Sequence, residues 1–226
     1  MPPRQHALDP YDRVTLGRMT HPVRGFLHGA AAVVSLVGAI LITLLSSGSV
    51  SDRVSLLVFG LSLVGLYAVS ALYHSVPWSE MWKKRMQRLD HSMIFVLVAG
   101  TFTPISWILF DGWLRWGTLI VQWGIVAVGV WEKMVSKKDR HAFSVALSTT
   151  QGWLAVLVVW PLAQRLPWPA LLLIGLGGVL YTVGMVLLVT GRPRLWPRWF
   201  SYHEVFHVLV VAASAVHFAA VARYIA

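Results

Sequence analysis

Seven long apolar stretches are the feature that most limits how this chain can fold. A helix crosses the hydrocarbon core of a bilayer with about 20 mainly apolar residues, because it satisfies its backbone hydrogen bonds internally. The expected spans are 25–45, 54–74, 90–110, 114–134, 142–162, 168–190 and 203–224. Hydrophobic residues make up 57% of the chain and charged residues 12%, about half the charged share of a soluble domain. The sequence therefore predicts an all-α bundle of seven transmembrane helices.

The basic residues fall in alternate loops between these spans. Of the 19 Lys and Arg, all but Arg53, Arg115, Arg165 and Arg223 precede the first span or follow the second, fourth and sixth. Loops rich in Lys and Arg stay in the cytoplasm. We therefore expect residues 1–24 to form a cytoplasmic tail, and residues 25–226 to form one membrane domain with its C-terminus outside. The net charge of +10 then reflects topology rather than nucleic-acid binding, and the predicted location is the inner (plasma) membrane.

The last span opens with the segment His203-Glu204-Val205-Phe206-His207. Two histidines four residues apart share one helix face, so both imidazoles can reach one metal ion. The chain contains no cysteine, which excludes thiolate ligands. A metal would therefore be held by histidine, carboxylate or water.

The predicted topology brings other polar groups to the same membrane surface. His74 ends the second span there and Asp90 begins the third, while His28 lies about one turn into the first. Ionisable residues inside a bilayer are costly and are functional candidates by default. These positions indicate a metal site within the bundle.

Three imidazoles and one water form the ligand set of an open catalytic zinc site, and zinc lowers the pKa of its water towards 7. We therefore expect Zn²⁺ at His74, His203 and His207, with a zinc-bound hydroxide as nucleophile. Asp90 could accept a proton from the water. Ser70, one turn before His74, could stabilise an oxyanion or hold the water.

Each of these residues also has a purely structural interpretation. The His203/His207 pair could extend towards the interface, His74 could cap its helix, Asp90 could cap the next one, and Ser70 could be a small packing residue.

Three further histidines are weaker candidates as ligands. His28 is expected to support a ligand or to pack between helices, and His91 is turned about 100° from Asp90. His217 lies about 15 Å beyond His207 along the helix. It is therefore expected to form a hydrogen bond within the bundle.

The segment His203–His207 also matches the zinc-protease signature H-E-x-x-H, in which the Glu is the general base. An intramembrane metalloprotease is thus one alternative. Against it, an acidic residue such as Glu204 is favourable in the first turn of any helix. The one histidine downstream, His217, is too distant to be a third ligand.

Taken together, these segments resemble the hemolysin III family, the bacterial branch of the progestin and adipoQ receptor (PAQR) proteins, whose wider superfamily includes alkaline ceramidases. The resemblance extends from about residue 28 to residue 217. It rests on three blocks: Ser70-Ala71-Leu72-Tyr73-His74; Leu89-Asp90-His91-Ser92-Met93-Ile94-Phe95 with Ala99-Gly100-Thr101-Phe102-Thr103-Pro104; and His203-Glu204-Val205-Phe206-His207 with His217-Phe218.

The resemblance implies zinc bound by His74, His203 and His207, with Ser70 and Asp90 around its water. It also implies hydrolysis of a lipid amide or ester, with a membrane lipid as substrate. Two non-enzymatic interpretations stay open: a membrane sensor or hemolysin-like protein with a structural zinc, and a pore or transporter. A pore would need a continuous polar path, whereas the outer halves of the spans hold few ionisable groups.

Overall fold

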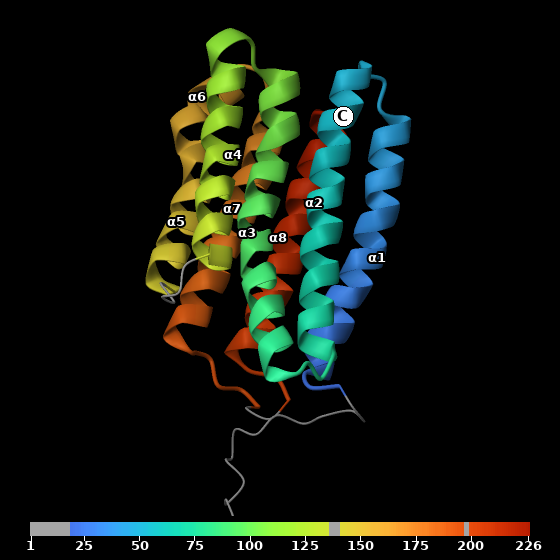
Figure 1. The fold of residues 1–226 in the computed structure, drawn as a ribbon. Helices are drawn as coiled ribbons and strands as arrows, with labels where there is room; N and C mark the ends of the chain where they lie inside the picture. The colour runs from blue at the N-terminus through green and yellow to red at the C-terminus, as the bar shows by residue number, and fades with distance from the viewer. Residues whose placement is uncertain (1–18, 136–140, 197–198) are drawn as a thin grey trace, which may run out of the picture.

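The computed structural model describes residues 19–135, 141–196 and 199–226. Within them, seven helices are long and apolar enough to cross a membrane, which confirms the predicted fold class (Figure 1). The elements are α1 (Pro22–Leu45), α2 (Val50–Ser75), α3 (Glu80–Leu109), α4 (Gly112–Val135), α5 (His141–Trp153), η1 (Leu154–Val158), α6 (Val159–Ala163), α7 (Trp168–Thr190) and α8 (Tyr202–Tyr224). Most of the predicted tail, residues 1–24, lies outside the described residues, as do Lys137, Lys138, Arg140 and Arg198.

The helix α3 begins ten residues earlier than the sequence predicts. It starts at Glu80, with Ser79 at its N-cap, and Asp90 lies three turns inside it. The capping interpretation of Asp90 is therefore wrong. The first ten residues of α3 include Lys83, Lys84 and Arg85. This part of the helix is therefore too polar to be detected as a span by hydropathy.

The fifth span is a succession of three helical segments rather than one continuous helix. The α-helical hydrogen-bond pattern of α5 ends at Trp153, the 3₁₀ segment η1 follows, and α6 completes the span. Together they cover residues 142–163 as one candidate membrane span, in agreement with the predicted 142–162.

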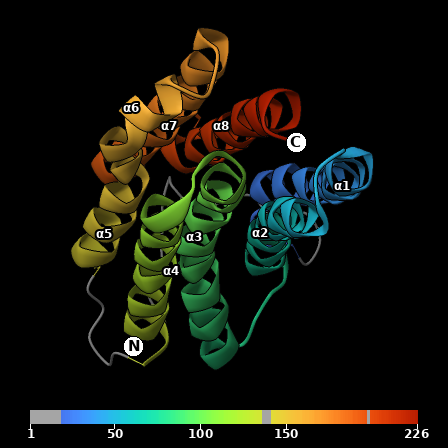
Figure 2. The same ribbon diagram turned by 90° about the horizontal axis from the view of Figure 1, so that it is seen from above.

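The seven spans form a closed ring when the bundle is seen along its axis (Figure 2). Each of α1 to α4 packs against the next, α4 packs against α5, and α7 packs against both α5 and α8. The ring closes where α8 returns to α1, and α3 additionally contacts α5 and α8. The first and last spans are thus neighbours, although they are distant in sequence.

Small residues allow α1, α2 and α3 to approach closely. A Cβ at Gly60 of α2 would overlap Ala39 of α1, and a Cβ at Gly100 of α3 would overlap Ser62 of α2. Without a strong hydrophobic drive between helices in lipid, such close contacts are a main source of association. They hold α2 between its two neighbours.

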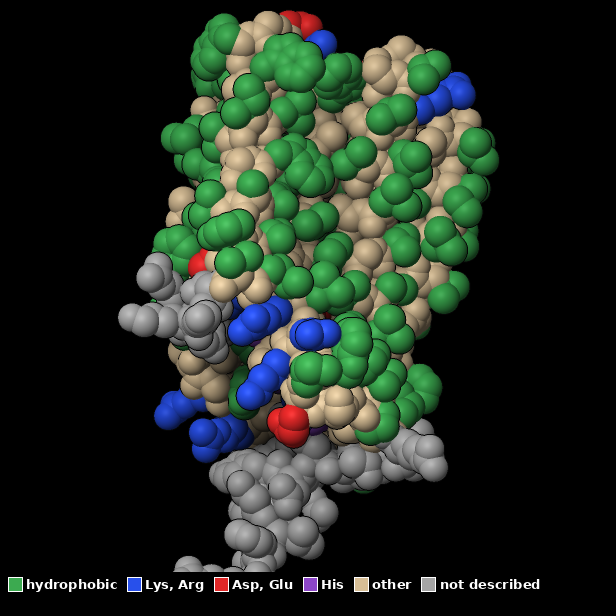
Figure 3. Space-filling view, viewed as in Figure 1, with side chains coloured by type: hydrophobic (Ala, Val, Ile, Leu, Met, Phe, Trp, Pro, Cys, Tyr) green, Lys and Arg blue, Asp and Glu red, His purple; other side chains and the backbone are tan. Residues whose placement is uncertain are grey.

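The outer surface of the bundle suits a bilayer (Figure 3). Large apolar side chains such as Val34 and Leu44 of α1 are exposed along its sides. Lys and Arg gather at one end, which we call the basic end, where α1, α3 and α8 begin and α2 ends (Figures 1 and 3). That this end faces the cytoplasm stays a prediction.

Candidate metal centre

Three histidines from two helices meet at the basic end of the bundle. His74 comes from the last turn of α2, and His203 and His207 come from the first two turns of α8. One ring nitrogen from each can be chosen so that all three lie within 4.8 Å of one another. The ring centroids of His74 and His207 are 4.9 Å apart, and those of His74 and His203 are 5.4 Å apart. The structure therefore brings together the three residues that the sequence predicted as metal ligands.

Three ring nitrogens of His74 and His207 have the character of ligand atoms. Both ring nitrogens of His74 and Nε2 of His207 are buried. None of these three atoms has a hydrogen-bond partner among the described residues. A buried polar atom without a partner is unfavourable, and a bound cation would remove this cost. Imidazole donors suit zinc, copper, iron or nickel. The histidine group can thus hold a metal ion.

The same observation argues against the capping interpretation of His74. Its ring makes no hydrogen bond to the end of α2 within the described residues. Its backbone carbonyl instead accepts hydrogen bonds from Thr20 Oγ1 at 2.7 Å and from the His21 amide at 3.0 Å. The segment before α1 therefore stabilises the end of α2, and the His74 imidazole is directed to the other histidines.

His28 of α1 supports the site by contacting His207. Nδ1 of His207 lies 2.8 Å from Nε2 of His28, and both side chains are buried. Metal-binding histidines commonly use their second nitrogen in such a bond, which fixes the ring and its tautomer. His28 therefore contacts a predicted ligand, and its supporting role stays a prediction.

Asp90 of α3 and Ser70 of α2 lie close enough for their side chains to interact. Ser70 is one turn before His74 on α2. Ser70 is buried and Asp90 is partly buried. The Asp90 side chain is thus at the same end of the bundle as the histidine group.

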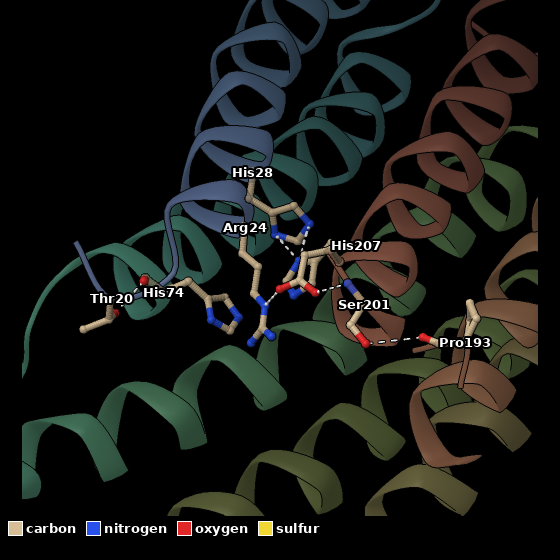
Figure 4. A network of polar contacts seen from close by, with 8 residues as sticks. Thr20, Arg24, His28, His74, Pro193, Ser201 and His207 are labelled. Atoms are coloured by element: carbon tan, nitrogen blue, oxygen red, sulfur yellow. Dashed lines mark hydrogen bonds and ion pairs between the residues drawn. The ribbon is translucent and has the colours of Figure 1, made fainter. Parts of the chain in front are cut away.

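Arg24 is a site residue that the sequence did not reveal. Its Nε donates to Oε1 of Glu204 at 2.8 Å (Figure 4), and only 6% of Arg24 and 2% of Glu204 are exposed. Electrostatic interactions also link Arg24 to His74, Asp90 and His207. Its position among the basic residues before the first span suggested a topology signal, which concealed this role.

The remaining histidine on α8 lies away from the metal-binding group. His217 is hydrogen-bonded through Nε2 to the carbonyl oxygen of Ile174 on α7, at 3.0 Å. This confirms the expected bond within the bundle. His91 of α3 is partly buried, and the histidine group comprises His74, His203 and His207 without it.

Comparison with known proteins shows the family to which this chain belongs. A family model described as "Haemolysin-III related" matches residues 17–218. The chain belongs to the hemolysin III family. A "Hemolysin-3 homolog" from Bacillus subtilis (strain 168) is 31% identical over 199 residues, which cover 87% of this chain and 90% of the relative.

More distant relatives place this hemolysin III protein within the PAQR proteins. The human "Monocyte to macrophage differentiation factor" is 22% identical and covers 91% of this chain and 84% of its own length. The "Adiponectin receptor protein" of Drosophila melanogaster is 23% identical over 64% of this chain and 35% of its own length. These matches and the seven spans support a multi-pass membrane protein.

Proposed function

We propose that this protein binds one zinc ion at His74, His203 and His207 and hydrolyses a membrane lipid amide or ester. The observation that carries the proposal is the convergence of three imidazoles, in which both ring nitrogens of His74 and Nε2 of His207 are buried without a hydrogen-bond partner among the described residues. Structural zinc sites usually have four protein ligands, whereas catalytic sites have three and an open position. A set of three histidines therefore favours catalysis over a purely structural metal.

A zinc ion bound here would supply Lewis acidity and activate a water molecule. Hydrolysis adds that water across the carbonyl C–N or C–O bond and yields a carboxylic acid with an amine or an alcohol. Asp90 accepts the proton of the attacking water and returns it to the leaving nitrogen or oxygen. Ser70 donates a hydrogen bond to Asp90 and orients the carboxylate, a role that the proximity of the two side chains favours over oxyanion stabilisation.

The place of the histidines in the bundle favours a lipid substrate. They lie in the terminal turns of α2 and α8 at the basic end, where the carbonyl groups of lipids meet the aqueous phase. The apolar sides of the bundle keep these turns at a fixed depth in the bilayer. An amide is the preferred linkage, because of the resemblance to alkaline ceramidases.

The contacts of Glu204 disfavour the metalloprotease alternative. Its Oε1 accepts the hydrogen bond from Arg24, and its Oε2 accepts one from the backbone amide of Ser201 at 2.8 Å. A general base must have an oxygen available to the attacking water. Both oxygens of Glu204 instead serve to hold the first turn of α8.

The test is a zinc measurement combined with a lipid screen on the purified protein. N-acyl and O-acyl lipids in mixed micelles would be incubated with it, and released fatty acid would be quantified by mass spectrometry. We expect about one zinc per chain and hydrolysis that is lost in Asp90→Asn. Zinc without hydrolysis of any lipid would contradict the proposal and favour a sensor with a structural metal.

A further inference from the structure

Two side chains of α1 contact two side chains of α8 in matching register. Arg24 and His28 lie one turn apart on α1, and Glu204 and His207 lie about one turn apart on α8. Arg24 Nε is 2.8 Å from Glu204 Oε1, and His28 Nε2 is 2.8 Å from His207 Nδ1. In Figure 4, Arg24 and His28 extend from α1, and His28 meets His207 of α8.

We propose that Arg24 and His28 are positioning residues, which hold the first two turns of α8 so that His203 and His207 present their imidazoles to the metal. We call Arg24, His28, Glu204 and His207 the α1–α8 lock. The inference rests on the proposed metal site at the three histidines. It does not depend on whether a lipid is hydrolysed.

The contact between Arg24 and Glu204, which we call the lower contact of the lock, fixes the start of α8. Glu204 accepts one hydrogen bond from Arg24 and another from the amide of Ser201, the residue at the N-cap. The carboxylate thus joins α1 to the first turn of α8. A buried ion pair often adds little net stability compared with apolar residues of similar size, so its value here is the geometry that it imposes.

The contact between His28 and His207, which we call the upper contact of the lock, fixes the orientation of the predicted ligand His207. With Nδ1 of His207 bonded to His28, Nε2 is the nitrogen left for the metal, and it is buried without a hydrogen-bond partner among the described residues. If Nε2 of His207 binds the metal, Nδ1 carries the proton and donates a hydrogen bond to His28. Such a bond sets both the tautomer and the ring orientation of a ligand.

The lock also accounts for the Glu in His203-Glu204-Val205-Phe206-His207. In a metalloprotease this residue would face the water, but here it lies between the N-cap of α8 and a guanidinium of α1. In the lock, Glu204 accepts hydrogen bonds from Arg24 and from the Ser201 amide.

Three substitutions test the upper contact. His28→Leu removes the acceptor of His207, whereas His28→Gln can keep a polar atom near the position of Nε2. His217→Leu is the matched control, because His217 is also a buried histidine bonded across helices, to Ile174, but lies outside the lock. Zinc affinity would be measured by chelator competition, and the visible absorption of the cobalt-substituted protein would report ligand geometry.

We expect His28→Leu to weaken zinc binding by about 10- to 100-fold and to alter the cobalt spectrum. His28→Gln should recover part of the affinity, and His217→Leu should leave affinity and spectrum unchanged while lowering the Tm of the metal-free protein. If His28→Leu lowers only the Tm, as the control does, His28 merely packs between helices and the upper contact of the lock is overturned.

The lower contact is tested with both charges removed together. Arg24→Met alone leaves Glu204 buried without its partner and can prevent folding, so the informative variant is Arg24→Met with Glu204→Gln. The pair should weaken zinc binding by about 10-fold or more and shift the cobalt spectrum. Wild-type affinity and an unchanged spectrum in this double variant would overturn the positioning role of Arg24.

The outcomes separate the lock from the hydrolase. If the zinc measurements behave as expected but the wild-type protein cleaves no lipid, the lock stands and the proposed activity fails. If lipid is cleaved and zinc affinity is insensitive to all these changes, the activity stands and the lock fails.

Discussion

Ser70 of α2 and Asp90 of α3 lie close enough for their side chains to interact across two neighbouring helices. This proximity brings α3 next to the part of α2 that carries His74. Asp90 lies inside α3, three turns from its start, so its side chain is not needed to cap the helix. A carboxylate that has no capping task and lies at the same end of the bundle as the histidine group is a candidate for proton transfer.

The first prediction concerns this carboxylate. Asp90→Asn keeps the shape of the side chain and a partner for Ser70 but removes the base. The variant should fold and retain zinc, and its rate of lipid hydrolysis should fall by about 10²- to 10⁴-fold. Steady-state kinetics with elemental analysis would check this. Loss of zinc would instead identify Asp90 as a ligand, and full activity would assign the proton transfer to another residue.

The partner of Asp90 gives a graded comparison. Ser70→Ala leaves the carboxylate in place and removes the hydroxyl that is proposed to donate to it. A hydrogen bond to a charged group is typically worth about 1.5–3 kcal/mol. We expect a decrease in kcat of about 10-fold, smaller than that of Asp90→Asn, with zinc content unchanged. A loss as large as that of Asp90→Asn would indicate that Ser70 acts directly on the substrate.

The second prediction concerns the ligands. His74→Ala, His203→Ala and His207→Ala should each sharply lower zinc content, because a site with three protein ligands has none to spare. His91→Ala is the control, since His91 lies outside the histidine group, and it should retain zinc. Full zinc content in His74→Ala and His207→Ala would rule out the site.

The seven spans and the histidine group could be predicted because each depends on a strong, simple signal. Hydropathy marks the spans, since about 20 apolar residues are needed to cross the hydrocarbon. Each further span then reverses the direction of the chain, so alternate ends share one surface. His74, at the end of the second span, and His203, at the start of the seventh, must therefore lie at the same depth.

The features that the sequence did not predict depend on contacts between residues distant in sequence, or on helical geometry that hydropathy does not report. Hydropathy placed the start of α3 at Asp90, but the helix extends back through polar residues to Glu80. The change to 3₁₀ geometry after Trp153 occurs within a uniformly apolar stretch. Arg24 and Glu204 are 180 residues apart in sequence, and no local pattern announces their pairing.

The third prediction concerns sidedness. Basic residues in alternate loops predict a cytoplasmic N-terminus and an external C-terminus. Reporter fusions after residue 136 and at the C-terminus should therefore report opposite sides, the first in the cytoplasm. The same side for both fusions would contradict the seven-span topology, whereas an exchange of the two sides would contradict only the orientation.

The fourth prediction concerns how α7 accommodates His217 of α8. A Cβ at Gly177 would overlap the His217 imidazole, which must stay in place to reach the Ile174 carbonyl. Gly177→Ala should therefore displace the ring and destabilise the protein by about 1–3 kcal/mol, seen as a lower Tm. Zinc content should not change, because the histidine group lies at the basic end, more than two turns away along α8.

The neighbouring glycine supplies the control for this prediction. Outside the local backbone of α7, a Cβ at Gly178 would meet no heavy atom of the described residues within 4 Å. Gly178→Ala should therefore leave the Tm unchanged or raise it slightly, since alanine favours a helix over glycine. In a His217→Ala background the ring is absent, and Gly177→Ala should then cost little. The two substitutions are thus expected to be strongly non-additive, as residues in contact are. Equal costs of Gly177→Ala with and without His217 would mean that the glycine serves the backbone of α7 and not the histidine.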